Sequence, residues 1–371
     1  NAQTIQCAKH PDFTYDIVSI DIGSSPDRQA IPGGKSFTCG VKPVECFLSY
    51  WADLQQKILY QDAPGPMRKD IALVGAGASG VEVALAMQHA LSVKLKEHNT
   101  TADIQFHIVS ASEDILPSHN AKVRDSYRQI LVKRKVMVHT DFRVSRIEKG
   151  LLVDESGEGA KQLNVDEIIW AVSASAPSWP RSAGLKCSNK GFIQVNAALQ
   201  SMSHNNVFAV GDIADVVEHP RPKAGVFAVR QGKPLAENLV RALQNKRLKP
   251  FTPQKRFLSL VSTGDKYAVA SRGKWALSGK WVWAWKNIID QKFMRSLNEL
   301  GLKSEPAVEE PASMRCGGCG AKVGQSILQR VIRQLSNSSC ETVPPDTTLL
   351  IPGNDDAAAF TVPQNKLIVQ S

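Results

Sequence analysis

A glycine-rich turn stands between a short apolar run and a helical pattern, and its residue types suit phosphate binding. Residues 71–74 predict a buried strand, Gly75, Gly77 and Gly80 follow within six residues, and a helix is expected over about 80–97. The first glycine permits a tight turn, the second lets the backbone approach a pyrophosphate, and the third lets helix and strand pack closely. Free N–H groups at the helix start would then meet the phosphates. The alternative is a glycine-tolerant strand–helix turn without a ligand.

A carboxylate follows a second buried run. Residues 207–210 predict a strand that ends at Gly211 and Asp212. A carboxylate at the carboxyl end of a strand can accept hydrogen bonds from a polyol, such as the ribityl chain of a flavin. The alternative is an Asx turn, which any strand followed by Gly-Asp can form.

The choice of nicotinamide coenzyme stays open. In dinucleotide folds an acidic residue at the end of the second strand bonds the ribose hydroxyls, whereas an arginine accommodates a 2′-phosphate. Here the predicted strand 104–109 is followed by Ser110, and Glu113 and Asp114 come a few residues later. No arginine stands at the strand end.

A third group of reactive residue types lies near the end of the chain. Cys316 and Cys319 form one Cys-x-x-Cys pair, with Lys322 close behind. One interpretation is half of a zinc site, but no second cysteine pair follows. A reactive thiol is favoured instead, because the lysine would stabilise a thiolate. Further on, Asp355 and Asp356 suit Mg²⁺ or a solvated turn.

Strands and helices alternate along most of the chain, which predicts an α/β fold with parallel sheets. Helices are also expected over about 44–60, 120–133, 226–244 and 281–300. A stretch rich in proline and glutamate predicts a linker. The expected parts are 1–66, 67–173, 174–303, 304–312 (linker) and 313–371 (start of a further domain). By the family resemblance given next, 67–173 would be a nicotinamide-binding domain, and 1–66 and 174–303 would be the two parts of a flavin-binding domain, the second with a basic, Trp-rich C-terminal region.

The order of these marks resembles the pyridine nucleotide-disulfide oxidoreductase family, and most closely its type II NADH dehydrogenase-like branch. The segment 16–24 with its Ile-Asp-Ile-Gly-Ser ending, the turn at 75–80 and the box at 209–212 carry the resemblance. It implies two nested Rossmann-like domains with parallel sheets, one binding FAD and the other NAD(P)H. By motif, the three glycines of the turn hold the nicotinamide nucleotide with Glu82 beside it, and the Gly211-Asp212 pair contacts the flavin.

Three departures from that family's pattern shape the expected chemistry. The first glycine fingerprint, which holds the ADP half of FAD, is absent, and the usual Ala-Thr-Gly box is Ala-Val-Ser at 171–173. Residues 1–310 contain no redox cysteine pair. Electron transfer to a small acceptor, a selenium compound or a quinone, is therefore expected in place of disulfide reduction.

Residues 313–371 resemble the start of selenide, water dikinase (selenophosphate synthetase), an α+β domain that would be truncated here. The Cys-Gly-Ala-Lys box at 319–322 and the Asp-Asp-Ala-Ala box at 355–358 carry this resemblance. It implies that Cys319 handles selenium and Lys322 aids phosphoryl transfer. It also implies that an aspartate of the 355–356 pair binds the Mg²⁺ that carries ATP phosphates.

Charge is unevenly distributed along the 371 residues, whose net charge is +10. Residues 251–303 hold ten basic against three acidic residues, and four of the seven tryptophans lie there. A solvated basic face with packed tryptophans is one interpretation, and contact of 274–295 with an anionic membrane surface is another. Nucleic acid is not expected. Seven scattered cysteines indicate a reducing, cytoplasmic setting, with or without membrane association. Whether the chain forms a homodimer stays open.

Together these patterns predict an FAD-dependent NAD(P)H oxidoreductase fused to a dikinase that converts ATP, selenide and water into selenophosphate, AMP and phosphate. The dikinase activity is expected only in the full-length protein. The alternative is a nucleotide-binding module without turnover, which senses redox state or tethers the dikinase to a membrane. A bound flavin that NADH reduces would favour the enzyme.

Overall fold

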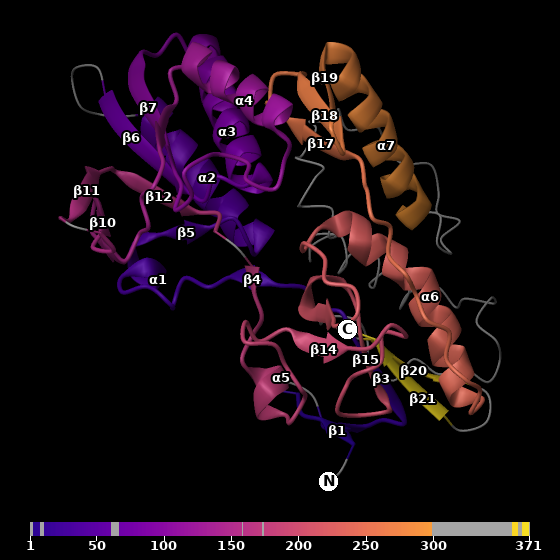
Figure 1. Cartoon of the computed structure of the whole chain (residues 1–371). Coiled ribbons are helices and arrows are strands. Elements are labelled where there is room, and N and C mark those ends of the chain that lie inside the picture. The colour runs from indigo at the N-terminus through magenta and orange to yellow at the C-terminus, as the bar shows by residue number, and fades with distance from the viewer. Residues whose placement is uncertain are drawn as a thin grey trace. The chain divides into compact units, whose positions relative to one another are not determined.

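The computed structural model describes residues 3–7, 11–60, 67–157, 159–172, 174–298, 358–362 and 366–370. The described residues form two compact units (Figure 1). The described residues within 3–25, 174–255 and 358–370 belong to the first unit, and those within 26–172 and 256–298 belong to the second.

A parallel five-stranded sheet is the centre of the second unit. Its strands, in spatial order, are β5 Cys39–Gly40, β12 Glu167–Trp170, β6 Met67–Val74, β7 Ala102–Val109 and β8 Met137–His139. Three helices cover one face: α2 Val44–Leu59, α3 Ala78–Glu97 and α4 Ala121–Lys133. Side chains alternate along β6, so Ile71 and Leu73 face these helices.

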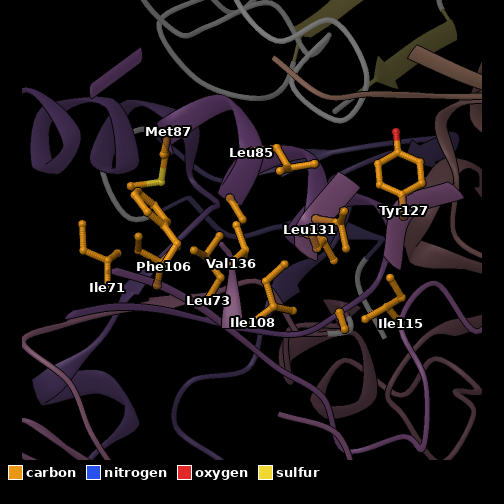
Figure 2. Close-up of a cluster of buried hydrophobic side chains, with 14 of the residues drawn as sticks. Ile71, Leu73, Leu85, Met87, Phe106, Ile108, Ile115, Tyr127, Leu131 and Val136 are labelled. Carbon is orange, nitrogen blue, oxygen red and sulfur yellow. The ribbon is translucent and has the colours of Figure 1, made fainter. Parts of the chain in front are cut away.

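The core on the helical face consists of buried apolar side chains that pack together (Figure 2). Phe106 and Ile108 of β7 pack with Leu85 of α3 and with Tyr127 and Leu131 of α4, and each is at most 1% exposed. Apolar residues recur along these helices at the spacing of one helical face. That burial fixes the direction in which α3 leaves the end of β6.

The opposite face of this sheet is covered by an antiparallel meander of β9 Arg146–Glu148, β10 Leu151–Asp154 and β11 Lys161–Asn164. Ala72 and Val74 of β6 pack there against Ile147 and Leu152. The sheet is therefore buried on both faces, which explains the uninterrupted apolar run in β6.

A second antiparallel sheet, with a helix after it, also belongs to the second unit. Its strands are β17 Ser259–Ser262, β18 Ala268–Arg272 and β19 Trp275–Gly279, followed by α7 Lys280–Asn298. Val261 and Val269 are buried in the same core as α3 and α4, and the Tyr127 hydroxyl donates to the Val261 carbonyl at 2.7 Å. Strand β19 was not predicted, because its exposed Trp275 and Leu277 directly precede the tryptophan-rich sequence of α7 and read as part of the same helix.

In the first unit, β15 Val207–Ala209 and β21 Lys366–Gln370 flank β3 Ile17–Ile20 in parallel, and β20 Ala358–Val362 adds an antiparallel edge. Strands β14 Ile193–Val195 and β16 Ala214–Val216 form a separate parallel pair. Leu235 and Leu239 of helix α6 Gly225–Leu243 pack in the core with Phe208. The remaining elements are short: β1 Thr4–Ile5, β2 Phe13–Thr14, β4 Ser25–Pro26, α1 Gly34–Phe37, β13 Ala174–Ser175, α5 Trp179–Ser182 and a 3₁₀ turn Gly211–Ile213.

The units differ from the ranges expected from the sequence in two places. Residues 26–66 were expected with the flavin-binding part, yet Leu54 and Ile58 of α2 are buried in the core of the second unit. Residues 256–298 were also expected with that part, and β17 and β18 likewise pack in the second unit. In both cases, apolar contacts between residues far apart in sequence decide the grouping. The expected helices over 44–60, 80–97, 120–133, 226–244 and 281–300 are confirmed within two residues at each end.

Candidate functional site

The glycine turn after β6 is closed by contacts that only glycine permits. A Cβ on Gly80 would lie 1.8 Å from the carbonyl oxygen of Gly75, and a Cβ on Gly75 would lie 2.6 Å from that of Ala171. Gly75 also has φ of +114°, a backbone conformation that favours glycine. These two glycines therefore serve the close packing of α3 on β6 and β12.

Gly77 differs from its two partners, because a Cβ there would meet nothing within 4 Å. Neither packing nor backbone strain demands a glycine at this position, so the open space beside it is the feature to explain. Gly77 is also the N-cap of α3, and no side chain caps the helix. A helix start without a side-chain cap is a place where backbone N–H groups can bind an anion, and here it lies beside a residue without a side chain. These residues fit the diphosphate of a dinucleotide.

Glu82, expected beside the coenzyme, lies one turn into α3 and is buried. Its Oε1 accepts a hydrogen bond from the Ser262 backbone N–H at 2.6 Å. Burial raises the pKa of Glu82 to about 7, while the bond from Ser262 and the charge of Lys286 oppose that rise. The carboxyl group therefore ties α3 to β17 and titrates near neutrality.

Lys286 is the cation of this cluster, and the sequence did not single it out. It lies on α7, is 7% exposed, and donates to Asp290 at 2.7 Å. An i, i+4 Lys–Asp pair on a helix is common at surfaces. What distinguishes the Lys286–Asp290 pair is that the charge of Lys286 acts on the buried Glu82 of α3. Glu82 and Lys286 are 204 residues apart in sequence.

In the first unit, the carboxyl ends of the parallel strands β3 and β15 bring the second predicted group together. The Ser24 hydroxyl donates to Asp212 Oδ2 at 3.2 Å, and the Gly211 N–H donates to the side-chain oxygen of Gln231 at 2.7 Å. Gly211 has φ of +71°, and a Cβ there would lie 2.2 Å from Asp21 Oδ1. The structure thus places Gly211 and Asp212 with three polar residues that the motif alone did not indicate: Asp21, Ser24 and Gln231.

Helix α6 begins beside the same cluster without a side-chain cap at Ala224. The preceding Lys223 donates to the Ala214 carbonyl, and its Nζ lies 4.1 Å from the centre of the Phe192 ring. Burial lowers the pKa of Lys223, and the charges of Asp215 and Asp212 oppose this shift. A hydroxyl-rich ligand whose ring gains negative charge on reduction would find both acceptors and positive charge here, which fits a flavin nucleotide.

The third predicted group falls outside the described residues. Cys319, Lys322, Asp355 and Asp356 all lie there, so the structure does not place them. Among the residues that it does describe, no cluster of three or more histidine, cysteine or acidic side chains could hold a metal ion.

The two sites can now be compared with known proteins. A model of the pyridine nucleotide-disulphide oxidoreductase family matches residues 1–232, which is more than half of the chain. This chain belongs to that family. Its α/β Rossmann-like fold with parallel sheets is the fold expected from the sequence. The matched family model ends at residue 232 and does not extend to residues 313–371.

The relatives differ in how much of the chain they cover. Ferroptosis suppressor protein 1 of Taeniopygia guttata is 27% identical over 208 residues, which is 52% of each protein. The type II NADH:quinone oxidoreductase of Staphylococcus aureus is 22% identical over 305 residues, 78% of this chain and 74% of that protein. The demethylphylloquinone reductase NdbB of Synechocystis is 24% identical over 203 residues, 55% of this chain and 47% of that protein.

Among solved structures, the sulfide:quinone oxidoreductase of Aquifex aeolicus has a similar fold, with a TM-score of 0.63 and 19% identity. That alignment covers 85% of this chain and 81% of the other. The chain spans about half the length of the first curated relatives it matches. The likeness to the solved structure shows a shared fold.

Replacing Gly77 tests whether the open space in the turn belongs to a ligand. In Gly77→Ala the methyl group meets no protein atom, so the free energy of unfolding should stay unchanged, whereas the Kd for NADH should rise about tenfold or more. Urea denaturation and fluorescence titration with NADH measure the two quantities. Gly157→Ala is the matched control, because its methyl group is equally unopposed but lies in a distant turn. Equal NADH affinity in both variants would contradict the assignment.

The pKa of Glu82 predicts a pH-dependent stability. The folded protein holds this proton more tightly than the unfolded chain, so its stabilising contribution is full below about pH 4.5 and is lost by about pH 7. In Glu82→Gln the amide oxygen can still accept from Ser262, but nothing titrates. The unfolding free energy of the variant relative to wild type should therefore rise by about 2 kcal/mol between pH 5 and pH 7. Urea denaturation at several pH values measures it, and a constant difference would refute the assigned pKa.

Proposed function

We propose that this chain is the electron-transferring part of an FAD-dependent NAD(P)H oxidoreductase that reduces a quinone-like acceptor. The observation that carries the proposal is the uncapped start of α3 beside the open Gly77, within a chain of this family. A second nucleotide site around Asp212 supports it. The names of two relatives, a demethylphylloquinone reductase and an NADH:quinone oxidoreductase, support a quinone as acceptor.

Each site has its own part in this reaction. Gly77 and the N–H groups of α3 hold the diphosphate of the nicotinamide coenzyme, and the Glu82–Ser262 bond fixes the helix that carries them. Asp212, oriented by Ser24, accepts hydrogen bonds from the flavin's polyol chain, while Lys223 and the start of α6 supply positive charge. When bound, the flavin would supply the redox chemistry between the nicotinamide coenzyme and a quinone.

Loss of the Asp212 carboxylate tests this proposal. Asp212→Ala should bind FAD at least about tenfold more weakly, because one hydrogen-bonded charged group contributes roughly 1.5–3 kcal/mol. Fluorescence titration with FAD measures the affinity, and steady-state NADH oxidation with a short-chain quinone measures turnover, which should fall in parallel. Asp12→Ala, an exposed aspartate of the same unit, is the control. A wild-type chain that binds FAD but transfers no electrons from NADH or NADPH to any quinone would support the redox sensor instead.

A quinone acceptor dissolved in lipid requires a membrane-facing surface, and we propose the Trp-rich surface of β19 and α7 for it. Its exposed apolar residues are Trp275, Leu277, Trp281, Trp285, Ile288 and Met294. Exposed basic residues lie among them: Lys274, Lys280, Lys292 and Arg295. Tryptophan and cationic side chains together suit the interface of an anionic bilayer. None of the described helices has the length and apolarity needed to span a bilayer.

Vesicle binding tests the Trp-rich surface. The double variant Trp275→Ser/Trp281→Ser should co-sediment with phosphatidylglycerol vesicles several-fold less than wild type, because it buries less apolar area at the interface. Salt should weaken the binding of the wild type. Trp179→Ser removes another exposed tryptophan (45%), which lies in the first unit, and should bind as wild type does. Wild-type protein that ignores vesicles at low salt would exclude this membrane contact.

For residues 313–371 we propose the start of a selenide, water dikinase. Two sequence features support it: the Cys319–Lys322 box and the Asp355-Asp356 pair, at about the spacing of that family. The full-length protein should convert ATP to AMP in the presence of selenide and Mg²⁺, and Cys319→Ser should abolish the reaction. Nucleotide chromatography measures the AMP formed, and an ATP turnover indifferent to selenide would refute the proposal.

A further inference from the structure

Three polar side chains form a hydrogen-bonded row across β6, β7 and β8. His107 Nε2 lies 3.0 Å from Asp70 Oδ1, and His107 Nδ1 lies 3.0 Å from His139 Nε2. The two imidazole rings are stacked, with centroids 5.3 Å apart. His107 is only 8% exposed, so these bonds are shielded from water. The row thus links the central strand of the five-stranded sheet to its edge strand β8.

Hydrogen-bond chemistry limits how many protons this row can hold. An ionised carboxylate only accepts, so His107 Nε2 carries a proton, and in the neutral ring Nδ1 accepts from His139 Nε2. One added proton preserves the bond between the rings, because one ring then donates and the other accepts. A second added proton leaves two N–H groups facing each other, and the bond breaks. The pair therefore bridges β7 and β8 only while it holds at most one added proton.

The charges around the pair keep Asp70 ionised and oppose the second proton. Burial raises the pKa of Asp70, but hydrogen bonds from His107 and Arg68 outweigh it and lower this pKa. Asp166, just before β12, accepts from the Asp70 N–H at 2.8 Å and adds a second carboxylate there. Burial and the charge of His107 lower the pKa of His139. The second proton therefore binds only in acid, below the ordinary pKa of histidine.

Strand β8 has few other contacts at its carboxyl end. It pairs with β7 alone among the described strands. Val136, just before the strand, is buried in the core, whereas the side chains of Met137 and Val138 are 51% and 38% exposed. Helix α4 also packs on β8, but from the other face of the sheet. The bond from His107 to His139 is therefore the side-chain contact that holds the end of this strand.

The end of β8 in turn holds the chain segment after β7. The His139 carbonyl accepts from the Ser110 N–H at 2.8 Å, and the Ser110 carbonyl accepts from the Phe142 N–H at 2.9 Å. The first glycine of the turn after β6 joins the same edge, because the Gly75 N–H donates to the Val109 carbonyl at 2.8 Å. In dinucleotide folds the segment after the second strand meets the adenosine ribose. The histidine pair thus acts on that segment through the edge strand.

We propose that His107 and His139 are positioning residues for the adenosine end of the coenzyme site, and that a second proton on the pair releases the end of β8 and weakens coenzyme binding. The inference rests on the proposed function, since it requires that the turn at 75–80 hold a dinucleotide. It adds an acid-sensitive control of that site. Glu82, which also titrates, lies on the helical face of the sheet, so substitutions separate the two effects.

Calorimetric titration of the whole chain with NAD⁺, which survives mild acid, measures coenzyme binding without electron transfer. In His139→Gln the amide can donate to His107 or accept from it, and it does not titrate. Between about pH 7.5 and pH 5, the Kd of the wild type should rise at least about fivefold more than that of this variant. His98→Gln removes an exposed histidine of the same unit and should keep the wild-type profile.

Nuclear magnetic resonance of the wild type follows the pair itself, without coenzyme. Labelling the histidines with nitrogen-15 should show coupled titration of His107 and His139 in two steps. Hydrogen exchange should show that the Ser110 amide, which donates to the His139 carbonyl, loses its protection at the second step. This measurement does not depend on the folding of any variant.

The outcomes separate the inference from the function beneath it. NAD⁺ affinities that follow the same pH profile in wild type and His139→Gln overturn the inference and leave the coenzyme site intact. A Ser110 amide that stays protected after both rings are protonated overturns the release of β8. A chain that binds no NAD⁺ at any pH overturns the dinucleotide site and the positioning role together.

Discussion

The close approach of α3 to β6 is the constraint on which the second unit depends. A Cβ on Gly80 would lie 1.8 Å from the Gly75 carbonyl oxygen, and one on Gly75 would lie 2.6 Å from that of Ala171, next to the end of β12. This contact sets where α3 begins and in which direction its first N–H groups point. A shift of the helix by the width of a methyl group would also displace Glu82 from the Ser262 N–H. The same two glycines therefore set the packing of α3 and the position of its first turn.

Both candidate sites follow one rule of parallel sheets. The carboxyl ends of neighbouring strands meet at one edge, so residues just beyond them come together although they are distant in sequence. In the second unit, the edge carries the glycine turn after β6 and Ser110 after β7. In the first unit, it carries Asp21 and Ser24 after β3, and Asp212 after β15. The buried strands fix where these residues lie, and the polar groups of both candidate sites follow the ends of those strands.

Local patterns predicted the parts that depend on neighbours in sequence. Three glycines between an apolar strand and a helix have one common structural use, and the helical periodicity of α4 is unambiguous. The bond between Glu82 and Ser262 was beyond prediction, because it joins residues 180 positions apart. The assignment of α2 and β17 to the second unit was missed for the same reason: their apolar residues could pack on either sheet, and only the tertiary contacts decide.

The charge pairing at the coenzyme end of the site joins residues that the sequence pattern does not bring together. The sequence has acidic residues soon after β7, at the place where dinucleotide folds select NADH. In the structure, two arginines of α4 pair with Asp114. Lys286 likewise favours the ionised carboxylate of Glu82, but burial outweighs it and raises the pKa of that group to about 7. In each case the partner comes from another element.

Hydrogen–deuterium exchange of the backbone amides around residues 76–81, with and without NADH, tests the central claim most directly. The account predicts that coenzyme binding slows exchange at the start of α3, because the diphosphate accepts hydrogen bonds from those N–H groups. Coenzyme binding that slows exchange elsewhere in the chain and leaves these amides unchanged would contradict it.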